Sequence, residues 1–295
     1  MTAYTINIKG RLMDLSEPKV MGVINVTPDS FYASSRARTE SEIVQRAAMM
    51  IADGADIIDI GAFSTRPDAS CVSEEDEKER LRMALTVVRR ELPDAVVSVD
   101  TFRPAVMQMA YDEFGADIIN DVSGGNPHGA FGGTADSSRD DAPDDDETSV
   151  PPMFSLAAKI GIPYILMSSK PTLESILIDF ARRTRQLRSL GVKDIILDPG
   201  FGFGKTLVQN YQLLNTLDRI GVFGLPVMAA LSRKSMLCNL VGTDADGALN
   251  ATTAANAVAL MRGASILRVH DVRECVQTIK IVTQTLRSSH HEQSV

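Results

Sequence analysis

Four polar residues with complementary hydrogen-bonding chemistry lie at or just after the ends of short apolar runs: Asp100, Asn120, Asp198 and Lys234. A carboxylate can accept two hydrogen bonds from the N–H edge of a heterocycle. A lysine donates to a ring carbonyl or nitrogen, and an asparagine does both. This combination predicts a pocket for a flat, polar heterocyclic ring.

A second group combines cations with hydroxyl and amide groups: Asn25, Thr65, Arg66, Arg268 and His270. Such side chains bind phosphate or pyrophosphate. The side-chain oxygen of Asn25 could also bind Mg²⁺, which often bridges protein and phosphate oxygens. Each residue alone has an ordinary alternative, since an aspartate at a strand end often caps a helix and Arg66 could lie on the surface. The coherent set favours a functional site.

The glycine-rich segment GFGFGKT at 200–206 resembles a phosphate-binding P-loop but lacks its spacing. A P-loop needs a glycine five positions before its second glycine, and that position is Pro199 here. The GxGxxG pattern also fails, because Lys205 occupies the position of the third glycine. We interpret the segment as a flexible loop in which Phe203 forms an aromatic wall; alternatively, its phenylalanines belong to the core.

The elements that must position these residues are short apolar runs, most of them rich in Val and Ile. The runs cover residues 20–25, 56–60, 95–100, 117–120, 163–167, 194–198, 226–232 and 265–270. Apolar residues at consecutive positions are typical of strands that are buried on both faces. Amphipathic helical patterns that end near a glycine separate several of the runs, as at Gly54, Gly191 and Gly263.

This alternation predicts an α/β fold, a (β/α)₈ TIM barrel, which typically takes about 250 residues. The alternative is a doubly wound open sheet, whose nucleotide fingerprint follows the first strand. Residues 25–31 contain no glycine, so we favour the barrel. In such a barrel the chemistry takes place at the C-terminal ends of the strands, where the polar residues occur.

Three segments lie outside the repeat within a single barrel domain, 1–295. Residues 4–15 alternate around a Lys-Gly pair and predict an N-terminal β-hairpin that could cover the bottom of the barrel. Residues 126–152 are rich in Gly, Asp and Ser, which favours a disordered, acidic surface insertion over a metal site. Residues 288–295 are expected to be a flexible tail.

The overall composition limits the partners. The net charge of −8 argues against broad nucleic-acid binding, which needs a basic surface. Cys71, Cys238 and Cys275 have no CxxC spacing, so reduced thiols are favoured over a zinc site or a disulfide. We find neither a signal-peptide pattern at residues 1–9 nor an apolar run long enough to span a membrane, and we expect a cytoplasmic protein.

Together the motifs resemble the dihydropteroate synthase family, in the family's order and over nearly the whole chain. The matching segments are MGVINVTPDSF (21–31), DIIDIGAFSTRP (56–67), SVDTF (98–102), DIINDVSGG (117–125), DPGFGFGK (198–205), SRKS (232–235) and RVHDV (268–272). The resemblance implies a (β/α)₈ barrel, usually a homodimer, and a transferase of folate biosynthesis. This family joins 6-hydroxymethyl-7,8-dihydropterin diphosphate to 4-aminobenzoate, releases pyrophosphate and is a target of sulfonamides.

The resemblance also implies roles for individual residues. The pterin pocket would contain Asp100, Asn120, Met167, Asp198 and Lys234. Anionic oxygens would bind to Thr65, Arg66, Arg268 and His270. The aminobenzoate site would be shaped by Phe31, Pro67, Phe203 and Ser235. Asn25 would bind Mg²⁺ beside the diphosphate. The residues implied in catalysis are Asp100, Lys234, Arg268 and His270. Because the aniline is a weak nucleophile, leaving-group stabilisation is the main requirement, and Arg268, His270 and Mg²⁺ would supply it, while Asp100 would favour positive charge on the pterin.

The chain also departs from the family pattern. Phe63 stands where the family usually has a glutamate, and residues 168–170 read Ser-Ser-Lys where it usually continues from the methionine into a histidine. A pterin-binding methyltransferase that acts on methyltetrahydrofolate, or a non-catalytic pterin-binding homologue, is the alternative. The methyltransferase would not need the segment 27–31, Arg66 or the Arg268–His270 pair. A non-catalytic homologue would be expected to have lost Asn25, Arg268 or Lys234, and all three are present, so we favour the synthase.

Overall fold

Eight parallel strands form the centre of the molecule in the computed structural model, which describes residues 4–26, 36–63, 72–125 and 150–291. The strands are β3 (Lys19–Asn25), β4 (Ile57–Gly61), β5 (Val97–Asp100), β6 (Ile118–Asp121), β7 (Tyr164–Met167), β8 (Ile195–Asp198), β9 (Met228–Ala229) and β10 (Ile266–Val269). They pair in the order β8-β7-β6-β5-β4-β3-β10-β9. A bridge between Leu197 and Val227 joins the two edges, so the predicted barrel is confirmed.

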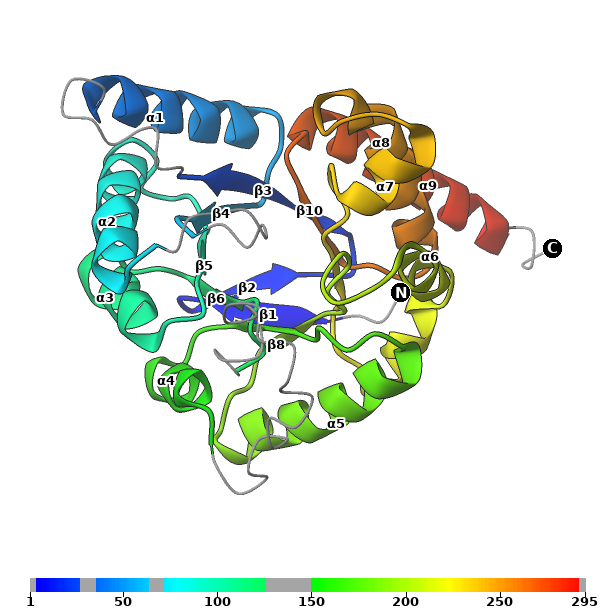
Figure 1. Ribbon diagram of the computed structural model, residues 1–295, viewed down its shortest axis with the longest axis horizontal. Coiled ribbons are helices and arrows are strands. Elements are labelled where there is room, and N and C mark those ends of the chain that lie inside the picture. The colour runs from blue at the N-terminus through cyan, green and yellow to red at the C-terminus, as the bar shows by residue number, and fades with distance from the viewer. Residues whose placement is uncertain (1–3, 27–35, 64–71, 126–149, 292–295) are drawn as a thin grey trace, which may run out of the picture.

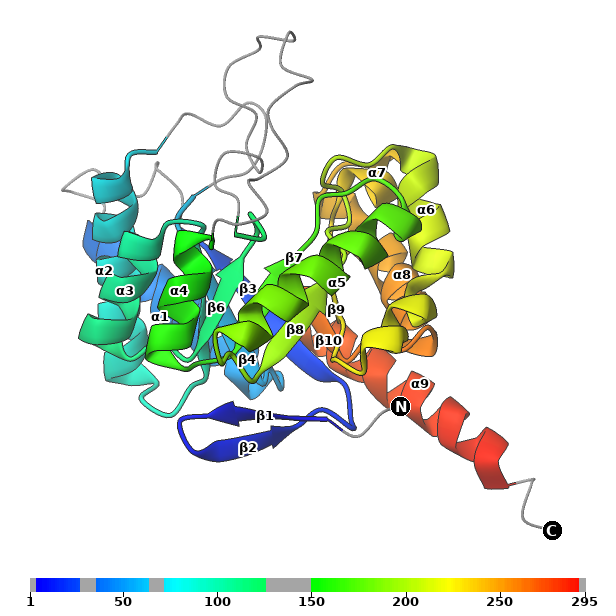
Figure 2. The ribbon, with the colours of Figure 1, turned by 90° about the horizontal axis from the view of Figure 1, so that it is seen from below.

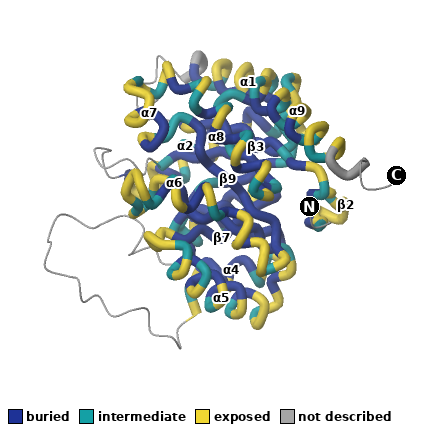
Figure 3. The backbone as a smooth tube through the Cα atoms, turned by 90° about the vertical axis from the view of Figure 1, so that its right-hand side faces the viewer, coloured by how far each residue is buried: buried dark blue, intermediate teal, exposed yellow. Residues whose placement is uncertain are grey.

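Helices surround the strands as a ring (Figure 1). They are α1 (Arg36–Ala52), α2 (Glu74–Glu91), α3 (Pro104–Phe114), α4 (Pro152–Ile160), α5 (Leu173–Ser189), α6 (Leu207–Asn215), α7 (Ser235–Val241), α8 (Leu249–Met261) and α9 (Val272–His291). The burial pattern follows this arrangement, with buried strands inside and exposed helix faces outside (Figure 3).

Local sequence explains where individual helices begin and end. The hydroxyl of Ser73 accepts a hydrogen bond from the backbone N–H of Asp76 and so caps α2. Four acidic residues fill the first turn of α2 and two arginines its last turn, which matches the helix dipole. Thr172 and Thr206 form capping boxes at the starts of α5 and α6.

Nearly all strand residues are buried. Successive residues of a strand alternate between the core that faces the helices and the interior of the barrel. On β8, Ile195 and Leu197 pack with the helices, whereas Ile196 belongs to the interior of the barrel. A strand with both faces covered needs apolar residues at consecutive positions, which is the pattern seen in the sequence.

An antiparallel hairpin of β1 (Thr5–Ile8) and β2 (Arg11–Asp14) lies across one end of the barrel (Figure 2). Ile6, Ile8 and Leu15 pack there against a ring of inward side chains near the starts of the strands. The ring consists of Met21, Ile57, Ile118, Ile165, Ile196, Met228 and Ile266. The predicted hairpin is therefore present, and it closes the bottom of the barrel with an apolar plug.

The two other segments predicted outside the repeat are described only in part. Of the predicted insertion 126–152, residues 126–149 lie outside the described residues, and Pro152 already belongs to α4. Of the expected tail 288–295, residues 288–291 are helical and form the end of α9, whose preceding turns pack Val276, Ile279 and Val282 against the core.

Two further observations concern expectations from composition. Cys238 and Cys275 are free thiols in the structure, whereas Cys71 lies outside the described residues. Within the part of the chain that the structure describes, we find no helix with the length and hydropathy needed to cross a membrane.

Candidate active site

The side chains that point into the barrel are apolar near the starts of the strands. One or two inward positions later, at the C-terminal ends, most of them are polar. This upper layer contains Asp59 on β4, Asp100 on β5, Asn120 on β6, Met167 on β7, Asp198 on β8 and Arg268 on β10. All but Asp59 are sequence-predicted site residues, and barrel closure brings them into one layer at the end where the chemistry of this fold takes place.

Arg268 is the centre of the polar layer. Its Nε donates to Oδ2 of Asp59 and its Nη2 to Oδ2 of Asp100, both at 2.7 Å. Asn120 donates to the same Asp59 oxygen at 3.1 Å. The sequence predicts a phosphate-binding role for Arg268, but the structure places its guanidinium between two carboxylates of neighbouring strands.

The charges of this group depend on one another. Burial raises the pKa of Asp100 to about 7, even though the Arg268 guanidinium acts in the opposite direction. Burial alone would lower the pKa of Arg268, but Asp59 and Asp100 outweigh it and raise that pKa above its ordinary value. Arg268 therefore stays charged, whereas Asp100 can exchange a proton near neutral pH.

Asp59 is a site residue that the sequence analysis missed. It is fully buried, and its Oδ1 has no hydrogen-bond partner among the described residues. The same holds for Oγ of Ser98 and Oδ1 of Asn120, so β4, β5 and β6 each contribute one unsatisfied oxygen. Buried polar atoms without a partner are costly, and a bound ligand with donor groups would satisfy them. The sequence signal for Asp59 is a charged residue inside an apolar run, two positions after Ile57 and therefore on the same inward face of the strand.

Asp198 and Lys234 form the opposite side of the layer. Oδ1 of Asp198 accepts a hydrogen bond from the backbone N–H of Gly200 at 2.8 Å. Burial raises the pKa of Asp198, although Lys234 opposes the shift. Burial also lowers the pKa of Lys234 to about 8. Its ammonium donates to the carbonyl of Phe201 and lies 4.9 Å from the centre of the Phe203 ring.

The loop at 200–206, predicted to be flexible, is held by an internal ammonium. Nζ of Lys205 donates to the carbonyls of Ser168, Gly200 and Phe203 at 3.3, 2.9 and 3.1 Å. Phe201 is fully buried in the core, and Phe203 is half-buried beside Lys234. Phe201 is therefore a core residue, as in the alternative interpretation of the sequence, whereas Phe203 lies at the candidate site.

Two glycines allow neighbouring loops to approach the end of β7. Gly124 and Gly200 have positive φ angles of 61° and 66°. A Cβ atom would lie 2.3 Å from the carbonyl oxygen of Met167 at Gly124, and 2.4 Å from that of Ser168 at Gly200. Neither position can accept another residue without moving the end of β7. Ser168, one of the departures from the family pattern, donates to Asp179 of α5 at 2.6 Å.

The loops after β9 and β10 are joined at two points. His270 Nδ1 lies 3.0 Å from Oγ of Ser232, and the guanidinium of Arg233 binds both carboxylate oxygens of Asp271. Burial, together with the positive charge of Arg268, lowers the pKa of His270 to about 4. His270 is thus neutral at pH 7 rather than a cation.

The remaining predicted residues lie at the edge of the described structure. Asn25 is exposed at the end of β3, and Ser235 is the exposed first residue of α7. Four predicted residues lie outside the described residues: Phe31, Thr65, Arg66 and Pro67. Among the described side chains, no group of three or more His, Cys, Asp or Glu residues could hold a metal ion.

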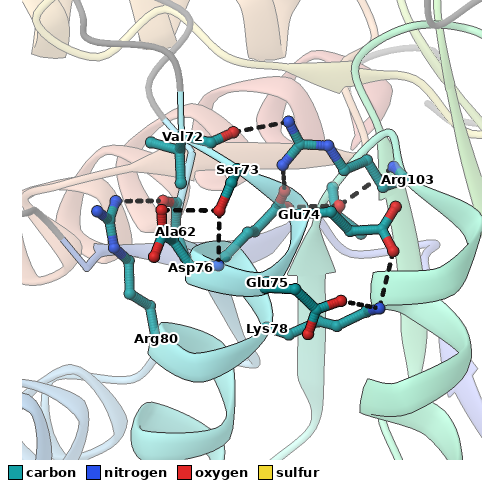
Figure 4. Close-up of polar contacts among 11 residues, drawn as sticks. Ala62, Val72, Ser73, Glu74, Glu75, Asp76, Lys78, Arg80 and Arg103 are labelled. Atoms are coloured by element: carbon teal, nitrogen blue, oxygen red, sulfur yellow. Dashed lines mark hydrogen bonds and ion pairs between the residues drawn. The ribbon is translucent and has the colours of Figure 1, made fainter.

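A second polar cluster, also missed from the sequence, holds both ends of the segment that follows β4 (Figure 4). Arg103 pairs with the fully buried Glu77 and donates to the carbonyl of Val72 at 2.8 Å. Its guanidinium also lies 5.4 Å from the Phe63 ring and 5.0 Å from the Phe102 ring. The family departure at Phe63 is thus part of a cation–π contact that links the ends of β4 and β5.

Comparison with known proteins places these features in context. The family model described as pterin binding enzyme matches residues 21–270. Dihydropteroate synthase of Escherichia coli (strain K12) is 35% identical over 290 residues, which cover 96% of this chain and 97% of the relative. The Haemophilus influenzae dihydropteroate synthase is 33% identical over 286 residues, or 92% and 95% of the two chains.

Solved structures give the same picture. Xanthomonas albilineans dihydropteroate synthase with 4-aminobenzoic acid has a TM-score of 0.79 and 32% identity, with all of both chains covered. The Yersinia pestis enzyme with a pterine-sulfa conjugate has a TM-score of 0.78 and 32% identity, and the match covers 96% of this chain and 100% of that one.

Proposed function

The chain belongs to the family of pterin-binding enzymes, and we propose that its polar barrel mouth performs the chemistry of a dihydropteroate synthase. The protein is a transferase of folate biosynthesis that condenses 6-hydroxymethyl-7,8-dihydropterin diphosphate with 4-aminobenzoate. The observation that carries our assignment of the pocket is the set of unsatisfied buried oxygens on β4, β5 and β6. A pterin ring has the N–H donors that such oxygens lack.

The upper layer of the barrel would bind the pterin by its edges. Asp198 offers a carboxylate to the 2-amino and N3 edge, because only one of its oxygens is engaged by Gly200. Lys234 would donate to a ring nitrogen or carbonyl, and Asn120 would use its unsatisfied oxygen. Met167 is buried and would supply an apolar contact.

Catalysis consists of one substitution at the carbon attached to the pterin. The bond from this carbon to the diphosphate oxygen breaks, the bond to the aniline nitrogen forms, and pyrophosphate leaves. The proton that the aniline nitrogen loses passes to the departing pyrophosphate or to water. Because the aniline is a weak nucleophile, positive charge develops on the pterin, and Asp100 and Asp198 stabilise it electrostatically. Arg268 and His270 would stabilise the departing pyrophosphate, together with Thr65 and Arg66.

We also propose Mg²⁺ as a cofactor. Asn25 fits this ion, because it offers a neutral amide oxygen at the exposed end of β3, in the mouth of the barrel. A single protein ligand is consistent with a cation that keeps several waters and binds substrate phosphates. Bound there, the ion would neutralise charge on the leaving diphosphate.

The aminobenzoate would occupy the outer part of the mouth. Phe203 and Ser235 lie next to Lys234, and we propose that they shape this site with Phe31 and Pro67. Since the pterin diphosphate carries several negative charges and does not cross membranes unaided, we propose that the reaction takes place in the cytoplasm.

We further propose that the chain forms a homodimer through the exposed faces of α7 and α8. Neither helix contains a charged residue, and Leu240, Val241 and Met261 are more than half exposed. Two copies of a chain with a net charge of −8 repel each other least where neither contributes charge. Leu240→Lys should therefore shift the protein to a monomer in sedimentation velocity.

The experiment that tests the function is a coupled assay for pyrophosphate release in which each substrate is omitted in turn. Release that requires both the pterin diphosphate and 4-aminobenzoate supports the synthase. Sulfonamides should compete with 4-aminobenzoate and not with the pterin substrate. Transfer of a methyl group from methyltetrahydrofolate, without pyrophosphate release, would instead support the methyltransferase.

A further inference from the structure

The hydroxyl of Ser232 makes two contacts with His270. The backbone N–H of His270 donates to Oγ at 3.2 Å, and the ring Nδ1 lies 3.0 Å from the same oxygen. Ser232 is 6% exposed, so its hydroxyl proton has little access to water. Among the described residues, the structure records no other hydrogen bond of this hydroxyl.

These contacts decide which ring nitrogen carries the proton. The backbone N–H already supplies one donor to Oγ, so the hydroxyl must direct its own proton to an acceptor. Nδ1 is the available acceptor only if it is unprotonated. A proton on Nδ1 would leave the buried hydroxyl proton without a partner, which is costly. Neutral His270 therefore carries its proton on Nε2.

A second contact fixes the distance on which this hydrogen bond depends. Arg233 follows Ser232, Asp271 follows His270, and the two form a bidentate pair with distances of 2.9 and 2.7 Å. Arg233 has a positive φ of 57°, and its backbone N–H donates to Oγ1 of Thr252 on α8. The loops after β9 and β10 are thus joined side by side.

We propose that Ser232 is a positioning residue that fixes the Nε2–H tautomer of His270, so that His270 binds an anionic oxygen of the diphosphate as a neutral hydrogen-bond donor. This role rests on the proposed synthase function, whereas the tautomer itself does not. Burial and the nearby cations Arg268, Arg46 and Arg233 disfavour a charged imidazole, which agrees with a neutral donor.

The test is ¹⁵N NMR spectroscopy of protein labelled at its four histidines, with His270 assigned from the signals lost in His270→Gln. At pH 7 the wild type should show a protonated Nε2 and an unprotonated Nδ1. Ser232→Ala should give a mixture of tautomers, and Ser232→Thr should restore the single form, because it keeps the hydroxyl. Thr184→Ala is the matched control, since it removes a buried hydroxyl that bonds within α5.

Kinetics provide the functional arm of the test. Ser232→Ala should lower kcat/KM for the pterin diphosphate by roughly three- to tenfold, the value of one oriented hydrogen bond. The KM for 4-aminobenzoate should hardly change, and Ser232→Thr should recover most of the loss. Arg233→Gly keeps the left-handed backbone without the ion pair, and should also broaden the tautomer equilibrium.

The outcomes separate the two proposals. A proton on Nδ1 in the wild type, or an unchanged tautomer in Ser232→Ala, would overturn the role of Ser232. If the wild type shows the expected tautomer but releases no pyrophosphate, the proposed function fails and the tautomer assignment stands. The inference is supported if the wild type and Thr184→Ala show a single tautomer of His270, and only Ser232→Ala and Arg233→Gly show a mixture.

Discussion

The two ends of the barrel interior are built on the same strands but from opposite chemistry. At the bottom, Ile57 and Ile196 contribute to an apolar layer against the N-terminal hairpin. Two residues further along the same strands, Asp59 and Asp198 are also buried, but they carry carboxylates. A step of two residues keeps the side chain on the same face and moves it towards the mouth.

The difference shows that burial alone does not distinguish structure from function in this molecule. The bottom layer lowers the free energy of the fold by removing apolar surface from water. The upper layer retains buried oxygens without partners, which a folded chain tolerates where a ligand supplies the missing donors. Substitutions at matched positions should therefore separate stability from binding.

The largest effect is expected where the polar layer also stabilises the fold. Arg268→Met leaves the carboxylates of Asp59 and Asp100 without their buried counter-ion, and should lower the free energy of unfolding by about 3–5 kcal/mol. Urea denaturation measures this loss. Arg287→Met is the control, because Arg287 is 63% exposed in its ion pair with Glu17 and should change stability by at most about 0.5 kcal/mol. Equal stability of the two variants would contradict a structural role for Arg268.

In the bottom layer, Ile196→Ala should lower the free energy of unfolding by about 2–5 kcal/mol through the cavity that it creates. The side chain is fully buried and lies one inward position below Asp198. Affinity for a pterin, measured by calorimetry below the unfolding temperature, should stay within about twofold of the wild type, because Ile196 lies in the apolar layer and not in the polar pocket. A twofold change corresponds to about 0.4 kcal/mol. A large loss of affinity would show that the two layers are coupled.

Asp198→Asn should produce the reverse result on the same strand. The amide oxygen can still accept from Gly200, but the amide nitrogen would face the N–H edge of the pterin as a second donor. An unpaired buried donor costs about 1–3 kcal/mol, so pterin affinity should fall roughly five- to 150-fold. Stability and pyrophosphate binding should hardly change. A silent substitution in calorimetric titration would mean that Asp198 only orders the loop.

A pH-dependent effect is expected from titration of Asp100 with Arg268 in place. Burial raises the pKa of Asp100 from 3.8 to about 7, so the folded state holds the proton more tightly than the unfolded state. The stability that this carboxyl contributes is therefore present at low pH and lost as the pH rises from 3.8 to about 7. The difference in unfolding free energy between wild type and Asp100→Asn should decrease over this range and level off above it. A difference that is independent of pH would exclude the raised pKa.

Most of the fold was predictable because parallel strands with two covered faces have a strong local signature. Each of the eight apolar runs overlaps a strand of the barrel, and the alternation at 4–15 is the hairpin. The exception is the end of α9, where Ser288 and its neighbours are polar but still helical. A helix that is already formed can extend into residues that would not begin one.

The site was predictable in its residue types but not in its pairings. Strand ends indicated Asp100, Asn120 and Asp198, yet only barrel closure places Arg268 between Asp59 and Asp100. Glu77 stands in the acidic stretch EEDEKER, which is typical of a solvated helix face, and its burial follows from contacts with Thr101 and Arg103. The neutral state of His270 likewise depends on its burial, which no local pattern encodes.

The two glycines that flank the end of β7 restrict how the pocket can evolve. Every single-nucleotide missense change of a glycine codon introduces a Cβ atom, and at Gly124 or Gly200 that atom would collide with a backbone carbonyl. Backbone cannot rotate away as a side chain can, so no intermediate substitution is tolerated there. We therefore expect these two positions to stay glycine between lineages, while neighbouring side chains, such as Ser168 at the end of β7, can vary.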